Sequence, residues 1–154
     1  MNPAVARRRV REGGFTIMEV AMATFVMAFG IATAIIVMQA GYRQIDLARG
    51  TTIAAQIIQS EMENLRMMSW TGISALPATQ TIDGSTYFPS NPTVASKYTI
   101  TRTVTANSTY PTEMVDITVA VTWNTYDGRS HTREYTAQYA KNGLYDYYYT
   151  VAHE

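Results

Sequence analysis

A single carboxylate, Glu19, lies at the edge of a long apolar segment. Residues 20–38 form a run of 19 residues without a charged side chain, and Glu19 directly precedes this run. An ionisable group in such a segment costs several kcal/mol in lipid unless it is paired, and groups of this kind usually have a function. The chemistry that a lone carboxylate offers here is ion pairing with a cation, so Glu19 is the first candidate functional residue.

The other residue types that commonly carry chemistry have no partners at a useful spacing. His131 and His153 are the two histidines, and neither has a second histidine or a carboxylate at the spacing of a metal site. We interpret both as solvated structural residues. Asp83-Gly84 and Asp127-Gly128 are typical of turns and lack the run of oxygen ligands that a calcium loop needs. The sequence has no cysteine, so we expect no thiolate metal site. It also has no Gly-x-Ser-x-Gly motif, no phosphate loop and no paired carboxylates at one site, so we expect no cofactor and no catalytic site, and the chain is not expected to be an enzyme.

The charge distribution predicts a membrane span that follows a basic leader. Four of the 12 basic residues lie in the leader, residues 1–14, and they are Arg7, Arg8, Arg9 and Arg11. The run 20–38 has about the length that a helix needs to cross a bilayer, and basic residues before a span predict a cytoplasmic N-terminus. Removal of the leader, which also holds one of the 12 acidic residues, would leave 8 basic and 11 acidic groups. The remainder is mildly acidic, so nucleic-acid binding is not expected.

Helical character continues beyond the span but becomes one-sided. Apolar residues recur there at helical spacing, while charged and amide residues lie largely at other positions. The apolar positions are Leu47, Ala54, Ile58, Met62 and Leu65. We expect one helix from about residue 15 to about residue 68, with a membrane-spanning half over 15–40 and an amphipathic half over 41–69. Its length would be on the order of 80 Å. Gly41 and Gly50 weaken this helix locally and mark where it could bend.

Residues 70–154 are predicted to form a β-rich globular region, which makes the fold class α+β. Two segments, 98–105 and 115–124, alternate apolar and polar residues with a period of two. A hairpin signal at Asp127-Gly128 separates the second segment from a third, 130–140. For the C-terminal tail, with Tyr145, Tyr147, Tyr148 and Tyr149, an edge strand, a subunit contact and a disordered segment remain equal alternatives.

The alternation of apolar and polar residues selects the register of the hairpin formed by segments 115–124 and 130–140. A two-residue turn at Asp127-Gly128 would place Val121 opposite Glu134, which mixes apolar and polar residues on one face. A three-residue loop over 126–128, with Gly128 in the left-handed conformation, instead places apolar residues opposite one another. The predicted pairs are Val119 with Tyr135, Ile117 with Ala137 and Val115 with Tyr139.

Residues 11–20 read Arg-Glu-Gly-Gly-Phe-Thr-Ile-Met-Glu-Val and resemble the type IV prepilin cleavage site. In that family a membrane aspartic peptidase cuts after the glycine, here Gly14, and the new N-terminal residue, here Phe15, is N-methylated. The glutamate at the fifth mature position is Glu19. The residue types agree with this chemistry, because Gly13 and Gly14 allow an extended backbone to enter an active site. An ordinary secretory signal is cut after its apolar stretch, whereas this cleavage keeps the apolar run as an anchor.

The resemblance covers residues 1 to about 68, and the β-rich region only in general plan. It implies a pilin-like fold, in which a long N-terminal helix packs on a small antiparallel β-sheet. Two features favour a minor subunit. Major pilins commonly carry a proline at the position of Ile36, and this span has none. The segments 54–66 and 119–129 are similar to V-type minor pilins and I-type minor pseudopilins.

The resemblance implies a structural subunit of a type IV pilus or of a type II secretion pseudopilus, polymerised through its N-terminal helix. The expected partners are prepilin peptidase and methylase, the inner-membrane assembly platform, other pilin or pseudopilin subunits and the lipid bilayer. The expected location is the bacterial inner membrane, with the C-terminal region outside the cytoplasm, and then the pilus or the periplasmic pseudopilus. Two alternatives remain open, namely a major pilin and a membrane-anchored binding domain that does not polymerise.

Under this hypothesis Glu19 has an intermolecular partner. The nearest basic residues are Arg11, which would be cleaved away, and Arg43, which lies several turns further along the helix. Cleavage creates a cationic α-amine at Phe15, so Glu19 of one subunit can pair with Phe15 of another and set the axial register.

Overall fold

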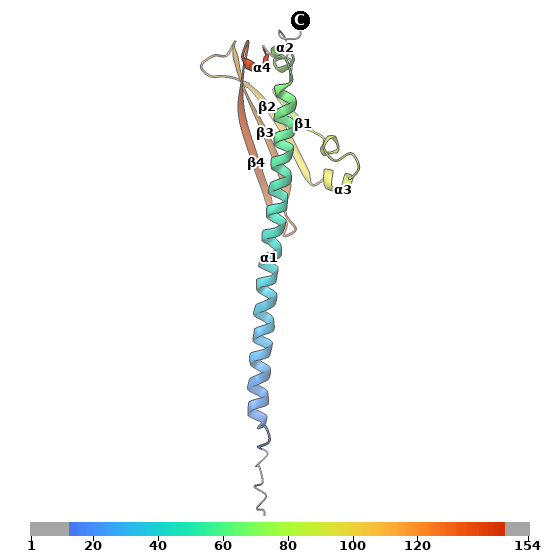
Figure 1. Ribbon diagram of the computed structural model, residues 1–154, viewed down its shortest axis with the longest axis vertical. Helices are drawn as coiled ribbons and strands as arrows, with labels where there is room; N and C mark the ends of the chain where they lie inside the picture. The colour runs from blue at the N-terminus through green and yellow to red at the C-terminus, as the bar shows by residue number, and fades with distance from the viewer. Residues whose placement is uncertain (1–12, 147–154) are drawn as a thin grey trace, which may run out of the picture. The chain divides into compact units, whose positions relative to one another are not determined.

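The helical and alternating patterns correspond to one long helix followed by a four-stranded antiparallel sheet (Figure 1). The structure is a computed structural model and describes residues 13–146. Its elements are α1 (Ile17–Arg66), α2 (Trp70–Ser74), β1 (Thr79–Ile82), η1 (Gly84–Thr86), α3 (Pro92–Ala95), β2 (Tyr98–Ala106), β3 (Met114–Asn124), β4 (Ser130–Ala140) and α4 (Leu144–Asp146). The predicted α+β class is confirmed at this level.

The chain divides into two units, residues 1–41 and residues 42–154, and α1 contributes to both. In the second unit, residues 42–66 of α1 lie along one face of the sheet (Figure 1). The buried apolar residues of this part of α1 are Ala54, Ile57, Ile58, Met62 and Leu65, which include four of the predicted stripe. Leu47, the fifth, is partly buried and packs against the same core.

The sheet contributes alternate residues to this core, among which Ile100, Val119 and Val121 are fully buried. Burial of each such side chain contributes roughly 1.5–3 kcal/mol.

Gly50 marks the closest approach of α1 to the sheet. The helix continues through Gly41 and Gly50 without interruption. A Cβ atom built on Gly50 would lie 2.2 Å from Nε1 of Trp123, which is buried on β3. The expectation that Gly50 weakens the helix therefore missed its main role, because only glycine leaves room for the indole ring at this distance.

The predicted hairpin register is confirmed. Val119 pairs with Tyr135, Ile117 with Ala137 and Val115 with Tyr139. The N–H of Thr125 donates a 2.9 Å hydrogen bond to the carbonyl oxygen of Arg129, which leaves a three-residue loop over 126–128. Gly128 has a φ of 78°, the left-handed conformation that the loop required.

Strand β1 was missed by the sequence analysis. It pairs antiparallel with β2 at one edge of the sheet, with Ile82 opposite Ile100. Only Ile82 of its four residues is apolar, and the other three are exposed. A strand without an apolar face gives no period-two signal in the sequence. This edge strand forms because the backbone N–H and C=O groups of β2 are available to pair with it.

A buried ion pair joins α1 to the sheet. Glu61 and Arg102 are 6% and 8% exposed, and Nη1 of Arg102 lies 2.8 Å from Oε1 of Glu61. The hydroxyl of Tyr87 donates a 2.6 Å hydrogen bond to Oε2 of Glu61, and Nη2 of Arg102 donates to Oε1 of Gln80. Burial, followed by this hydrogen bond, raises the pKa of Tyr87 well above its ordinary value of 10. The sequence contained a signal for this pair. Arg102 is two residues after Ile100 and four after Tyr98, so it lies on the same, buried face of the strand.

Candidate functional site

The residues that precede α1 are accessible and not helical. Gly13, Gly14, Phe15 and Thr16 are all exposed, and Phe15 is 83% exposed. No heavy atom lies within 4 Å of a Cβ built on Gly13 or Gly14. Backbone of this kind can pair with an enzyme as an added strand, and a helix cannot do so. The peptide bond between Gly14 and Phe15 is therefore accessible and lies outside the helix.

Thr16 starts the helix directly after this segment. Its Oγ1 accepts a 3.2 Å hydrogen bond from the N–H of Glu19, and its carbonyl oxygen accepts from the N–H of Val20. Thr16-x-x-Glu19 has the spacing of a capping box, and a carboxylate in the first turn interacts favourably with the helix dipole. The role of Thr16 at the helix start was missed by the sequence analysis, although the Thr-x-x-Glu spacing was visible. Any test of Glu19 must therefore keep the capping-box spacing while it removes the charge.

The carboxylate of Glu19 has no ion-pair partner within residues 13–146. The ion pairs in that range join Arg66 to Glu63, Arg102 to Glu61 and Arg129 to Asp127. Glu19 is exposed at the start of the apolar helix. The pairing of Glu19 with the α-amine of another subunit remains a prediction.

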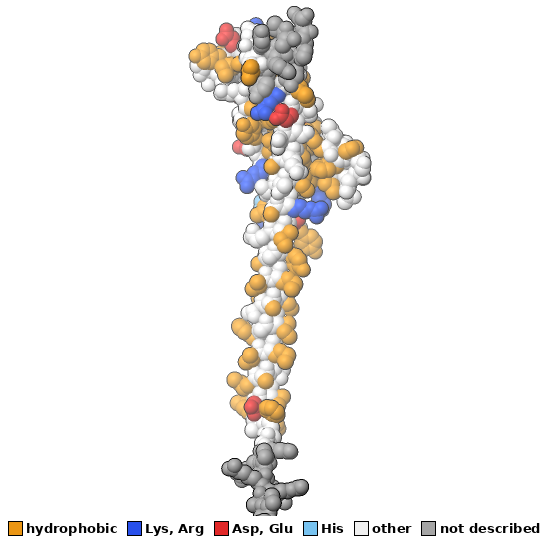
Figure 2. Space-filling model, viewed as in Figure 1, with side chains coloured by type: hydrophobic (Ala, Val, Ile, Leu, Met, Phe, Trp, Pro, Cys, Tyr) orange, Lys and Arg blue, Asp and Glu red, His pale blue; other side chains and the backbone are white. Residues whose placement is uncertain are grey.

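The part of α1 in the first unit presents an apolar surface. None of the described residues before Tyr42 is buried. The large apolar side chains that are more than half exposed include Ile17, Phe25, Val26, Phe29, Ile36 and Val37. Figure 2 shows hydrophobic side chains along this segment. α1 is long and apolar enough to cross a membrane, and it is the helix of the described chain that meets this criterion. A surface of this kind requires lipid or other apolar helices around it.

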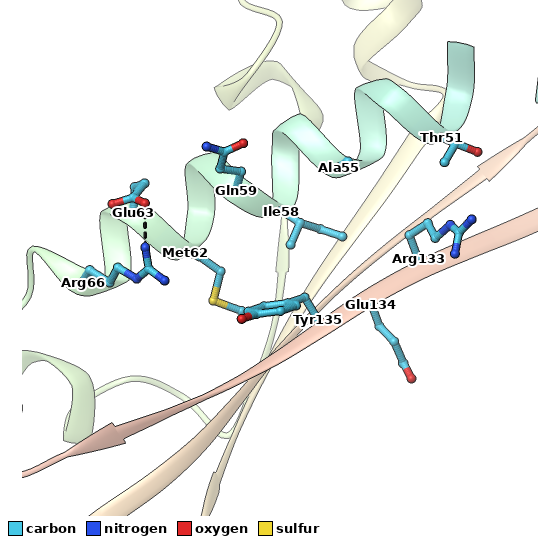
Figure 3. A pocket seen from close by; sticks show the side chains of 10 residues that line it. All are labelled: Thr51, Ala55, Ile58, Gln59, Met62, Glu63, Arg66, Arg133, Glu134 and Tyr135. Carbon is cyan, nitrogen blue, oxygen red and sulfur yellow. Dashed lines mark hydrogen bonds and ion pairs between the residues drawn. The ribbon is translucent and has the colours of Figure 1, made fainter. Parts of the chain in front are cut away.

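A groove of about 500 Å³ lies in the second unit between α1 and β4 (Figure 3). Ile58 and Met62 of α1 face Tyr135 of β4 across it, and the 2.7 Å ion pair between Glu63 and Arg66 lies at one end. The remaining lining residues are Thr51, Ala55, Gln59, Arg133 and Glu134. Tyr135 is 52% exposed, so the groove is open along β4, the second edge strand. The groove thus presents a mixture of apolar and charged side chains.

The side chains set aside in the sequence analysis have structural roles. His131 is partly buried and stacks on Trp123, with ring centroids 5.7 Å apart. Asp83 caps η1 by accepting a hydrogen bond from the N–H of Ser85, and Asp127 accepts one from the hydroxyl of Thr125. These hydrogen bonds lower the pKa of both carboxyl groups, and the interpretation of both as turn residues is confirmed.

Several predicted residues lie outside the described part of the chain. They are the basic leader residues Arg7 to Arg11, His153 and the tail residues Tyr147 to Tyr149, together with the side chain of Tyr145. Within residues 13–146, no group of three or more His, Cys, Asp or Glu side chains is placed to hold a metal ion. No match to this chain was found among protein-family models, curated proteins or solved structures.

Proposed function

We propose that the chain is a membrane-anchored filament subunit that is cleaved between Gly14 and Phe15 and assembles through the first part of α1. The observation that carries this proposal is the order of features at the start of the helix. An accessible Gly-Gly-Phe segment is followed by a helix whose exposed surface is apolar, with one carboxylate, Glu19, in its first turn. A simple membrane anchor whose helix starts with a capping box accounts for the apolar surface and for Glu19, but it gives no reason for the accessible Gly-Gly-Phe segment that precedes them.

Cleavage would act as the switch for assembly. Before cleavage the α-amine is at Met1, far from Glu19 along the chain, and after cleavage it is at Phe15. An ion pair between this amine and Glu19 of a neighbouring subunit would lie in apolar surroundings, where an unpaired charge is costly. Only the axial register that pairs the two charges avoids this cost, so the pair would specify that register. N-methylation of Phe15, which the resemblance to type IV pilins implies, keeps the amine cationic. The same resemblance favours a minor subunit of a type IV pilus or of a type II secretion pseudopilus.

The variant Glu19→Gln tests the role of the charge. Glutamine preserves the Thr-x-x-Gln form of the capping box, so the helix start and membrane insertion should be unaffected. We expect normal processing, with a mature chain that begins at Phe15 by mass spectrometry. We expect incorporation into sheared filaments to fall by at least about tenfold, which corresponds to a loss of about 1.4 kcal/mol.

Glu63→Gln is the matched control, because Glu63 is an exposed carboxylate on the same helix. It should be incorporated at the unmutated level. Incorporation of Glu19→Gln at that level would contradict the role of Glu19 in assembly. An intact N-terminus at Met1 in the membrane-bound chain would contradict the cleavage.

The groove between α1 and β4 supports a second candidate function, a membrane-anchored binding domain that does not polymerise. Such a protein would keep its leader and would remain in the membrane fraction. The same mass measurement separates the two candidates, because only the filament subunit is expected to begin at Phe15. Abundance separates a major from a minor subunit, since a major pilin should dominate the sheared filaments.

A further inference from the structure

The second unit begins shortly after the uncharged run in the sequence. Three residues, 39–41, connect the uncharged run 20–38 to Tyr42. Even fully extended, three residues reach only about 10 Å, and in a helix they rise about 4.5 Å. If the run crosses a membrane, Tyr42 and its neighbours stay near the headgroups at whatever angle the two units meet.

The tip of the β3–β4 hairpin lies beside these same residues. The N–H of Tyr126 donates a 2.7 Å hydrogen bond to Oδ2 of Asp46, which lies about one helical turn after Tyr42. The hydroxyl of Thr125 donates a 2.6 Å hydrogen bond to Oδ1 of Asp127, and this bond is the main cause that lowers the pKa of the Asp127 carboxyl, with weaker contributions from the charges of Arg129 and Arg43. A loop that is 80 residues distant in sequence is therefore held beside the first turns that α1 contributes to the second unit.

The side chains at this end of the second unit combine exposed aromatic and basic groups. Tyr126 is 99% exposed, and Tyr42 and Ile45 are 65% and 64% exposed. Arg49, Lys97 and Tyr126 line one cleft of about 450 Å³, to which Asp46 also contributes. Two of the residues that line this cleft are basic, Arg49 and Lys97, and one is acidic, Asp46. The exposed Arg43 precedes Asp46 on α1, and Arg129 forms an ion pair with Asp127.

We propose that this membrane-proximal surface docks on anionic phospholipid headgroups while the subunit is anchored. It consists of Tyr42, Ile45, Tyr126, Arg43, Arg49, Lys97 and Arg129. Tyrosine is enriched where proteins meet the membrane interface, because its ring is apolar and its hydroxyl is polar. Basic side chains near an anionic leaflet are attracted to it. The proposal rests on the membrane insertion contained in the proposed function.

Cysteine labelling of the full chain in vesicles tests this inference, since the natural sequence has no cysteine. An environment-sensitive fluorophore is attached at Tyr126→Cys and, as the matched control, at Tyr110→Cys. Tyr110 is 56% exposed and lies in the β2–β3 loop, at the opposite end of β3. In vesicles of phosphatidylethanolamine and phosphatidylglycerol, we expect nitroxide-headgroup lipids to quench the probe at 126 severalfold more strongly than the probe at 110. The difference should shrink in phosphatidylcholine vesicles and in Lys97→Gln/Arg129→Gln, but not in Lys141→Gln.

A third probe at Met38→Cys distinguishes the possible failures. If acyl-chain nitroxides quench position 38 while positions 126 and 110 respond alike to headgroup nitroxides, the docking proposal is wrong and insertion stands. If position 38 is not quenched, the membrane insertion itself is contradicted, and the docking proposal with it. If shielding of position 126 follows protein density and not anionic lipid, a second copy of the chain covers this surface, and the proposal is likewise overturned.

Discussion

At the residue scale, Gly50 sets the distance between α1 and the sheet. It is buried, and the indole of Trp123 occupies the space that any side chain at position 50 would need. Nε1 of Trp123 is buried without a hydrogen-bond acceptor in the part of the chain that the structure describes. The contact is therefore a steric one, in which close packing of the ring against the helix backbone compensates for an unsatisfied N–H.

This contact predicts opposite effects for two glycine-to-alanine changes in α1. Gly50→Ala should destabilise the fold by about 1–3 kcal/mol, because overpacking outweighs the gain of about 1 kcal/mol in helix propensity. Gly41→Ala has no heavy atom within 4 Å of the new methyl group and should be neutral or slightly stabilising. Urea denaturation of both variants in detergent, followed by tryptophan fluorescence, measures the difference. Equal stabilities would show that the helix moves away from Trp123 without cost.

The pair between Glu61 and Arg102 predicts a large effect of charge removal. Glu61→Leu leaves the guanidinium of Arg102 buried without its carboxylate and should cost about 3–5 kcal/mol. The double variant Glu61→Leu/Arg102→Leu removes both charges and should recover most of this loss. Glu63→Leu, at an exposed position two residues away, should change stability by at most about 1 kcal/mol. The same denaturation measurement applies, and a double variant no more stable than Glu61→Leu would contradict the cost assigned to the unpaired charge.

At the scale of elements, the patterns that span many residues were predicted and the short ones were not. The helix, strands β2 to β4 and the hairpin register follow from apolar periodicity, and Gly128 supplied the loop type. β1 and α3 are four residues each, too short for a period to show, although Asn91 caps α3 in the structure. The candidate residues Gly14, Phe15 and Glu19 were found because they lie within one stretch of six residues. The groove beside Tyr135 depends on two elements that meet only in the folded chain, so no local pattern indicates it.

Three tyrosines whose hydroxyl groups have raised pKa values predict a loss of stability at alkaline pH. Burial raises the pKa of Tyr87, Tyr98 and Tyr139 above the ordinary value of 10. The unfolded chain therefore releases these protons at a lower pH than the folded chain does. Their contribution is fully present below about pH 10 and is lost as the pH rises through the folded-state values. Melting temperatures recorded from about pH 8 to about pH 11 should fall above about pH 10, and less steeply in Tyr139→Phe. A flat profile would contradict this assignment.

At the scale of the whole molecule, the two units differ in what stabilises them. The core cluster of buried apolar residues begins at Ala54 and draws only on the second unit. The described residues before Tyr42 have no buried member, so their helix depends on lipid or on neighbouring chains for its surroundings. In the proposed transfer from a bilayer into a filament, the surroundings of the first unit would change while the second unit would keep its core.

A fragment that begins at Tyr42 should therefore fold without the span. Residues 42–66 should remain docked as a helix, because Gly50, Ala54 and Leu65 are buried against the sheet, and the pair between Glu61 and Arg102 lies wholly within the fragment. We expect its melting temperature, measured by circular dichroism in aqueous buffer, to lie within a few degrees of that of the β-rich unit in the detergent-solubilised full chain. A fragment that begins at Ile53 is the matched control, because it lacks Gly50 and about three turns of the docked helix, and it should melt lower. An unfolded 42–154 fragment would mean that the span stabilises the second unit, and that transfer from membrane to filament cannot leave that unit unchanged.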